Sequence, residues 1–109
     1  YNLVVTTAET GVVEPATKHG VGLFNASINA ALSNPNNAEQ TRKVSDWCRE
    51  RDIDLAALNL QFCLRERRFA STLIGFSRPA RVEQNVKDYG MTFPDEVWEE
   101  LKGDFGLGN

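Results

Sequence analysis

Two strand-like runs, residues 21–27 and 70–74, constrain the fold of this chain more than any other feature. The first run, VGLFNAS, is apolar without alternation up to its last residues, which is typical of a strand covered on both faces in a parallel sheet. Helical patterns separate and flank the two runs, and strands that alternate with helices indicate βαβ units. Two strands alone leave both edges of such a sheet open. The pattern therefore predicts an α/β fold that belongs to a larger parallel sheet.

Local capping signals define the expected helices. We expect Asp54 to cap the helix that follows it, and Asn36 or Asn37 to cap the preceding helix. His19, the only histidine, lies next to Gly20, a residue suited to the left-handed position after a helix end, so we expect a C-terminal cap rather than a catalytic role. The expected helices cover residues 10–18, 38–51, 55–66, 79–89 and 94–102.

Apolar stripes at helical spacing indicate which helix faces the core covers. We expect the last residues, 103–109, to fray. The residues expected on the stripes are Val44, Trp47 and Cys48, then Leu55, Leu58, Phe62 and Leu64, and finally Val82, Val86 and Tyr89.

Composition and charge exclude several classes of partner. The 109 residues are enough for one small core, and 41% hydrophobic with 25% charged residues is ordinary for a globular protein. A net charge of −3 provides no basic field, so we expect neither nucleic acid nor anionic lipid as a partner. No apolar run approaches the ~18 residues that span a membrane. The chain starts at Tyr1 without a methionine, which is typical of a truncated or fragmentary reading frame.

The two cysteines, Cys48 and Cys63, lie in helical patterns without a CxxC motif or a nearby histidine. This arrangement favours two thiols in a reducing compartment over a disulfide or a metal site. We therefore expect no metal and a cytoplasmic location.

The stretch STLIGFSRPARVEQN, residues 71–85, places a glycine and a serine between a strand and a helix. A nucleophile elbow is one interpretation, but its G-x-S-x-G motif needs a second small residue where this chain has Pro79. A triad would also need a histidine after the serine, and the chain has none there. Two interpretations stay open: an anion site, or an ordinary helix cap at Ser77 beside solvent-exposed arginines.

An anion site would use several groups of this turn. Gly75 has no Cβ, so a ligand could approach its backbone closely. Ser77 offers a hydroxyl and an N–H, and the helix that begins near Pro79 points free N–H groups at the same place. Arg78 and Arg81 lie against the helix dipole, which is easier to understand if a polyanion binds there. The planar amides that follow, able to recognise a base edge or a ribose, are Gln84 and Asn85.

Three segments resemble the C-terminal part of the aldo-keto reductases: GVGLFNAS, CRERDIDLAALNLQFCLRERRFASTLIGFSRPARVEQNV and FPDEVWEEL. The nearest branch contains dehydrogenases of aldoses such as fucose and galactose. The resemblance implies a partial (β/α)8 TIM barrel with strands seven and eight, flanking helices six to eight and a C-terminal helix. It implies a single C-terminal fragment, residues 1–109: a loop and short helix after strand six (1–20), strand seven with its following helices (21–69), and strand eight, helix eight and the extension (70–109).

The resemblance also implies a nicotinamide dinucleotide, NADP or NAD, at the Gly75 turn. By position, Ser27 matches a residue that contacts the pyrophosphate, and Arg81 matches one that commonly faces the 2′-phosphate of NADP. Relatives usually have a proline after Ser27 and then a glycine-rich loop, and this chain departs from that pattern. The remaining matched residues are Gly75, Phe76 and Ser77 around the adenosine phosphate, and Gln84 and Asn85 at the adenine.

The implied function is that of the cofactor-binding portion of an NAD(P)-dependent oxidoreductase acting on a small sugar or aldehyde. The family's tyrosine, lysine, aspartate and histidine come from early strands, so we expect no catalytic residue here and an inactive isolated chain. Neither Tyr1 nor Tyr89, which we expect on the buried side of its helix, has a lysine–aspartate pair beside it. The alternative is a non-catalytic nucleotide-binding or interaction module, which could self-associate through its open strand edges.

Overall fold

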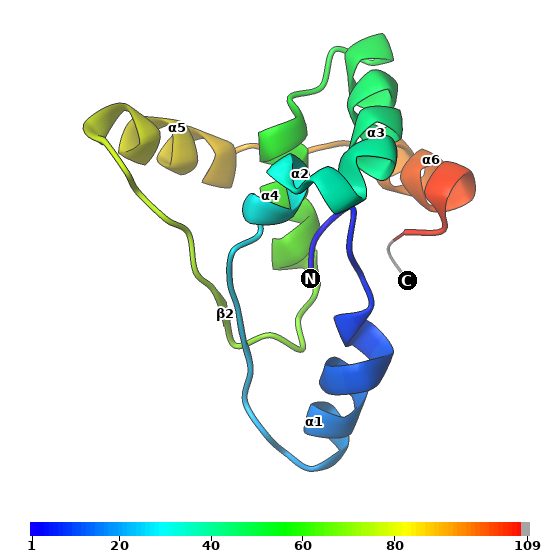
Figure 1. Cartoon of the computed structure of the whole chain (residues 1–109), viewed down its shortest axis with the longest axis vertical. Coiled ribbons are helices and arrows are strands. Elements are labelled where there is room, and N and C mark those ends of the chain that lie inside the picture. Colours follow the sequence, from blue (N-terminus) through cyan, green and yellow to red (C-terminus); the bar gives the residue numbers. More distant parts are fainter. Residues whose placement is uncertain (108–109) are drawn as a thin grey trace.

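A computed structural model describes residues 1–107 of the chain. Short helical segments precede the first strand, and four longer helices follow it (Figure 1). The elements in chain order are a π-helical turn η1 (Glu9–Val13), α1 (Glu14–Lys18), β1 (Phe24–Asn25), α2 (Ala30–Ser33), the 3₁₀ turn η2 (Pro35–Asn37), α3 (Ala38–Glu50), α4 (Leu55–Arg65), β2 (Ser71–Thr72), α5 (Pro79–Tyr89) and α6 (Asp95–Phe105).

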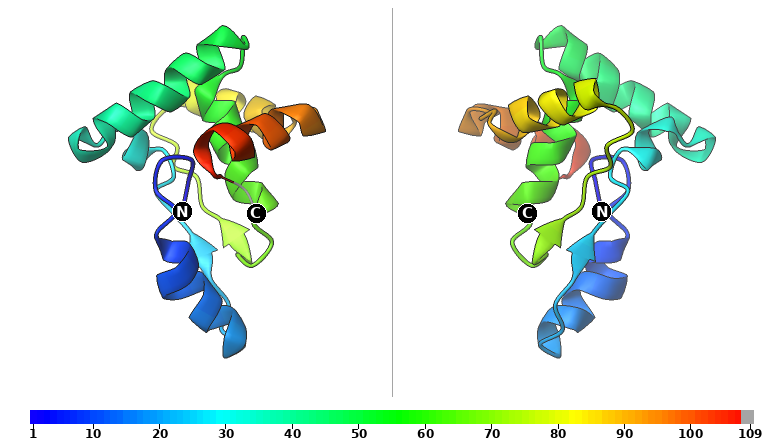
Figure 2. Two further views of the ribbon diagram at one scale, coloured as in Figure 1. Left: turned by 90° about the vertical axis from the view of Figure 1, so that its right-hand side faces the viewer. Right: turned by 90° about the vertical axis from the view of Figure 1, so that its left-hand side faces the viewer.

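The strands β1 and β2 pair in parallel, with Phe24 opposite Ser71 and Asn25 opposite Thr72. Figure 2 shows the two arrows side by side, with the longer helices at one end of the sheet and α1 at the other. Both strands are shorter than the predicted runs at residues 21–27 and 70–74. Within residues 1–107 each strand has one paired neighbour, and the ladder covers two residues of each strand.

Most helices lie where the sequence predicts them. Asp54 caps α4 by accepting a hydrogen bond from the Ala57 N–H at 2.9 Å, as expected. His19 occupies the C-terminal cap of α1, and Gly20 follows with a φ of +67°.

The expected helix at residues 10–18 is instead a π-helical turn that continues into α1. Asn37 is the N-cap residue of α3, but the prediction that its side chain caps the helix is wrong, because its amide donates to the Ala31 carbonyl instead.

The C-terminal tail is more ordered than predicted. Helix α6 continues through Phe105, Gly106 closes it in the left-handed conformation, and Leu107 is 9% exposed. The expectation of fraying is therefore wrong for residues 103–107, because Asp104 accepts a hydrogen bond from the Trp47 indole at 2.8 Å and ties α6 to α3. The rest of the expected frayed tail, residues 108–109, lies outside the described residues.

Helix α4 is the centre of the molecule, since it contributes to both apolar clusters. The stripe of α3 and the residues Leu58 and Phe62 of α4 are buried as predicted, in a cluster shared with the N-terminal segment and α6. On its other side α4 packs against the loops that follow the strands, in a second cluster. The buried residues of the first cluster are Leu3, Val44, Trp47, Cys48, Leu58, Phe62, Leu101 and Leu107, and those of the second are Ile28, Leu60 and Cys63.

Helix α5 presents the opposite face to the one predicted. Val82, Val86 and Tyr89 are exposed at 42%, 66% and 67%, while the polar residues Asn85 and Asp88 are buried. Gln61 in α4 donates from its amide nitrogen to the backbone carbonyls of Asp88 and Tyr89, which attaches the C-terminal end of α5 to α4, and the buried Asn85 donates to the Gly75 carbonyl. The prediction that Tyr89 lies on the buried side of this helix is therefore wrong.

Candidate functional site

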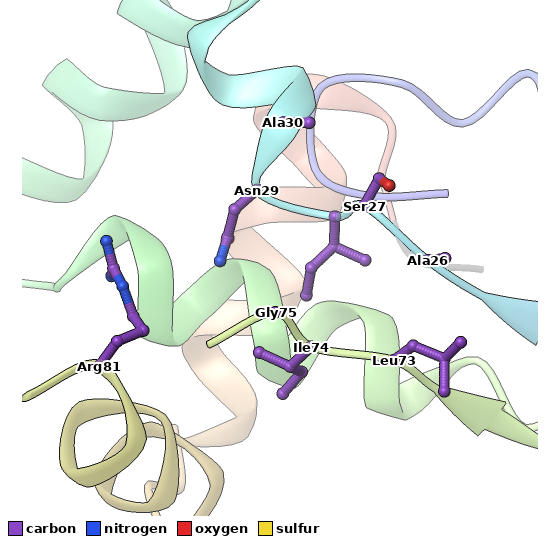
Figure 3. Close-up of a pocket in the computed structure, with 9 residues that line it drawn as sticks. Ala26, Ser27, Asn29, Ala30, Leu73, Ile74, Gly75 and Arg81 are labelled. Carbon is purple, nitrogen blue, oxygen red and sulfur yellow. The ribbon is translucent and has the colours of Figure 1, made fainter. Parts of the chain in front are cut away.

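A cavity of about 470 Å³ lies where the carboxyl ends of β1 and β2 meet (Figure 3). Because the two strands are parallel, the loops that follow them emerge at the same edge of the sheet, which is where open α/β sheets bind ligands. Its volume falls within the range of about 300–1,000 Å³ typical of small-molecule sites. The lining residues are Ala26, Ser27, Ile28, Asn29 and Ala30 after β1, Leu73, Ile74 and Gly75 after β2, and Arg81 from α5.

The loop after β1 contains a strained residue. Ser27 has a φ of +57°, in the left-handed region that residues other than glycine seldom adopt. Its carbonyl accepts a hydrogen bond from the Ala30 N–H at 3.1 Å, and the next residue, Ile28, is buried against α4. Such strain persists only where the surrounding structure fixes it, and it is common at ligand sites.

The Gly75 turn is hydrogen-bonded to α5. Asn85 is 6% exposed, and its amide nitrogen donates to the Gly75 carbonyl at 3.4 Å. A Cβ at Gly75 would meet nothing within 4 Å, so the surrounding packing does not require a glycine there. What the glycine contributes is an uncovered stretch of backbone beside the cavity.

The N-terminus of α5 carries the positive charge of the site. Its N-cap residue is Arg78, without a capping side chain, so the interpretation of Ser77 as an ordinary helix cap is wrong, whereas Arg78 and Arg81 are both exposed to solvent, as that interpretation expected. Within the described residues neither Arg78 nor Arg81 forms an ion pair. Arg81 lines the main cavity and also, with Arg78, Ala80 and Gln84, a second cavity of about 140 Å³.

The structure thus brings three of the seven predicted site residues, Ser27, Gly75 and Arg81, to one cavity. Gln84 lines the smaller cavity, and its amide nitrogen donates to the Asp88 carboxylate at 2.8 Å. Asn85 lines neither cavity and is hydrogen-bonded to the carbonyl of the Gly75 turn. Phe76 and Ser77 are exposed, Phe76 at 58%, and line neither of these two cavities.

The sequence analysis did not single out Asn29, although its side chain lines the cavity. The available signal was a polar residue directly after the buried Ile28, at the end of the first strand-like run. That signal is weak, since an asparagine in a loop is usually explained by turn geometry alone.

The two tyrosines have environments unlike that of a general acid or base. The ring of Tyr1 stacks on Phe62 at 5.2 Å, and burial, with the nearby carboxylates of Glu9 and Glu66, raises the pKa of its phenol from 10.0 to about 12. Tyr89 is mostly exposed. A phenol that exchanges protons near neutral pH needs a lowered pKa, and Tyr1 has the reverse.

A charged cluster near Tyr1 has a structural role. The Arg68 guanidinium contacts Glu66 at 2.7 Å and Glu9 at 3.0 Å, which joins the loop before β2 to η1. The hydrogen bonds from Arg68 hold the pKa of the Glu66 carboxyl below its usual value.

In the described part of the chain, no group of His, Cys, Asp and Glu side chains is placed to hold a metal ion. No helix there is long and apolar enough to cross a membrane.

Comparison with known proteins defines the class of the chain. The profile of the Aldo/keto reductase family matches residues 1–103, so the chain belongs to this family, as the resemblance of its motifs implied. The family fold is a (β/α)8 barrel, and a helical structure with a parallel pair of strands is compatible with part of one. The names of the family and of its members indicate an oxidoreductase.

Two curated relatives are similar over almost the whole chain. Pyridoxal 4-dehydrogenase of Microbacterium luteolum is 32% identical over 123 residues, which cover 95% of this chain and 35% of that protein. D-threo-aldose 1-dehydrogenase of a Pseudomonas species is 27% identical over 118 residues, which cover 93% of this chain and 36% of that protein. The chain therefore spans about a third of the length of these relatives. Both alignments are longer than the 109-residue chain, so the relatives contain internal residues that this chain lacks.

Proposed function

We propose that this chain is the C-terminal, cofactor-binding portion of an NAD(P)-dependent aldo/keto reductase. In this proposal β1 is strand seven and β2 strand eight of the barrel, α5 is helix eight, and α6 is the C-terminal extension. Residues 1–20 then follow strand six, residues 21–69 contain strand seven and its helices, and residues 70–109 contain the rest. The two relatives are each aligned over about a third of their own length, which is in line with a part of a barrel.

The observation that carries the proposal is the cavity shared by Ser27, Gly75 and Arg81. In (β/α)8 barrels the phosphate site is frequently built by the loops after strands seven and eight, and the cavity lies after the two strands of this sheet. Its positive charge comes from a guanidinium without a carboxylate partner in the described residues. A guanidinium fork matches a phosphate dianion, which supports Arg81 as the residue that faces the 2′-phosphate of NADP.

The other site residues take complementary roles in the proposal. Ser27 contacts the pyrophosphate, and the turn of Gly75, Phe76 and Ser77 surrounds the adenosine phosphate. The amide nitrogens of Gln84 and Asn85 already donate to Asp88 and to the Gly75 carbonyl. Their amide oxygens remain as acceptors, which suits the exocyclic amine of adenine.

The chemistry of the complete enzyme is hydride transfer between a nicotinamide and a carbonyl or hemiacetal carbon. The names of the relatives, a pyridoxal and an aldose dehydrogenase, support a small aldehyde or sugar as substrate. The chain itself supplies binding and orientation of the nucleotide. Because neither tyrosine has the environment of a general acid, we expect residues 1–109 alone to show no reduction of aldehydes with NADPH above background.

Titration of the chain with NADPH and NADH tests the cofactor role. Replacing Arg81→Ala removes a charge-assisted contact worth about 1.5–3 kcal/mol, so NADPH binding should weaken about 10-fold or more while NADH binding changes less. Arg42→Ala is the matched control, because Arg42 is an exposed arginine on α3 away from the cavity. Equal losses for both nucleotides would remove the 2′-phosphate role from Arg81.

A non-catalytic interaction module is the second candidate function. It is favoured by large apolar side chains that are exposed beside the short sheet, among them Phe24 at 69% and Leu73 at 51%. Apolar surface beside open strand edges favours association with another chain. This candidate predicts self-association whether or not a nucleotide is bound.

A further inference from the structure

The hydrogen bonds of a buried asparagine fix which end of the Asn29 amide faces the cavity. Asn59 in α4 is fully buried, and its Oδ1 accepts a hydrogen bond from the Leu3 backbone N–H at 3.0 Å. A backbone N–H can only donate, so this end of the Asn59 amide must be the oxygen. The other end, Nδ2, donates to the Ile28 carbonyl at 3.1 Å, and a carbonyl can only accept.

The same Nδ2 of Asn59 also donates to Asn29 Oδ1 at 3.4 Å. Since Asn59 presents a donor, the atom of Asn29 that faces it must be the acceptor, its oxygen. The nitrogen of Asn29 is then the end that is left over. Asn29 is the residue before α2, but its side chain forms no capping hydrogen bond there, so helix capping does not account for its orientation.

This nitrogen lies at the cavity. Figure 3 shows it at the tip of the Asn29 side chain, turned toward the space between Arg81 and Gly75. Asn29 and Arg81 both line this cavity, one from the loop after β1 and the other from α5. Both present N–H donors, and the lining residues include no carboxylate. A cavity with donors on two walls and no acidic side chain is suited to an anion.

We propose that Asn29 is an anion-binding residue that donates a hydrogen bond from Nδ2 to a phosphate oxygen of the bound dinucleotide, opposite the Arg81 guanidinium. The inference rests on the proposed function for the identity of the ligand. It adds to that function a side chain whose amide orientation is set by Asn59, a buried residue that does not line the cavity.

Two substitutions separate the donor from the rest of the side chain. Asn29→Asp keeps an oxygen for Asn59 but places a negative charge where the donor was, whereas Asn29→Ala removes the donor without adding charge. We expect binding of NADP to weaken about 10-fold for Asn29→Ala, which loses one hydrogen bond, and about 100-fold for Asn29→Asp, which also places a like charge against the phosphate. Asn36→Asp is the matched control: it adds the same charge to the 3₁₀ turn η2, just beyond α2, at an exposed residue that does not line the cavity.

Calorimetric titration with NADP and with inorganic pyrophosphate, on chains whose melting temperatures have been compared, distinguishes the outcomes. The proposal is supported if Asn29→Asp weakens the binding of both NADP and pyrophosphate while Asn36→Asp weakens neither. If the unmodified chain binds only pyrophosphate and Asn29→Asp abolishes this, the anion contact stands and the dinucleotide assignment fails. If NADP binds equally well to the unmodified chain and to Asn29→Asp, the role of Asn29 is refuted while the proposed function survives. Failure of the unmodified chain to bind either ligand refutes both.

Discussion

At the scale of single residues, burial controls the chemistry of the two thiols. Cys63 is fully buried and Cys48 is 2% exposed. Burial raises the pKa of Cys48 from 9.0 to about 11 and that of Cys63 to about 12. Because the thiolate is the reactive form, both residues should be poor nucleophiles in the folded chain. Their chemistry therefore reports on folding.

We predict that both thiols react with iodoacetamide at least about 100-fold more slowly in the native chain than in urea. A rise of two pKa units lowers the thiolate fraction by that factor. Mass spectrometry of the modified chain measures this. The single variants Cys48→Ala and Cys63→Ala assign each rate. Equal rates in native and denaturing buffer would contradict the burial of these side chains.

The same shifts predict a loss of stability in alkali. The folded-state pKa values of Cys48, Cys63 and Tyr1 all lie above their ordinary values of 9.0 and 10.0. The folded state therefore holds its protons longer, and its full stability is present below pH 9 and lost as the pH rises toward 12. The urea midpoint, followed by tryptophan fluorescence, should fall steadily across this range. A constant midpoint between pH 9 and pH 11 would be inconsistent with these environments.

At the scale of elements, the start of α4 depends on one carboxylate. Asp54 accepts from the Ala57 N–H at 2.9 Å, and α4 contributes to both apolar clusters. We predict that Asp54→Ala lowers the free energy of unfolding by about 1 kcal/mol, while Asp54→Asn, which keeps a capping oxygen, changes it by much less. Urea denaturation measures the difference. A similar loss in both variants would mean that the charge, and not the cap, stabilises the helix.

This cap was readable from the sequence because it is local: acceptor and donor are three residues apart. The orientation of α5 could not be predicted from the sequence. The spacing of Val82, Val86 and Tyr89 shows that they share a face, but it does not show whether any other part of the chain covers that face. The covered face is the polar one: Asn85 on this face donates to the Gly75 carbonyl, and Gln61 in α4 donates to the backbone carbonyls at the end of the helix.

The candidate site divides in the same way. Ser27, Gly75 and Arg81 could be expected together, because the ends of parallel strands share one edge of a sheet. Their binding roles remain predictions from the resemblance. Asn29 could not be expected, since the orientation of its amide depends on Asn59, thirty positions away, and on Leu3 beyond it. Residue spacing carries no information about two such successive hydrogen bonds between distant residues.

At the scale of the whole molecule, the exposed apolar side chains are the feature that most needs explanation. They occur along the sheet, in the Gly75 turn and on α5, whereas a folded monomer normally exposes such residues singly. Each strand of the pair also has an unpaired edge within the described residues. The exposed large apolar residues of these parts are Val21, Phe24, Leu73, Phe76, Val82, Val86 and Tyr89.

We predict that the isolated chain associates with a second copy through the side of the sheet that carries Phe24, which is 69% exposed on β1. Sedimentation velocity should show a weight-average mass that rises with concentration. Phe24→Lys should weaken this association about 10-fold or more, because a buried aromatic anchor is worth more than 1 kcal/mol at an interface. Val12→Lys, at a half-exposed residue of η1 that belongs to neither strand, should leave it unchanged. A monomer that melts cooperatively at every concentration would show instead that the open edges and apolar side chains of this chain need no partner.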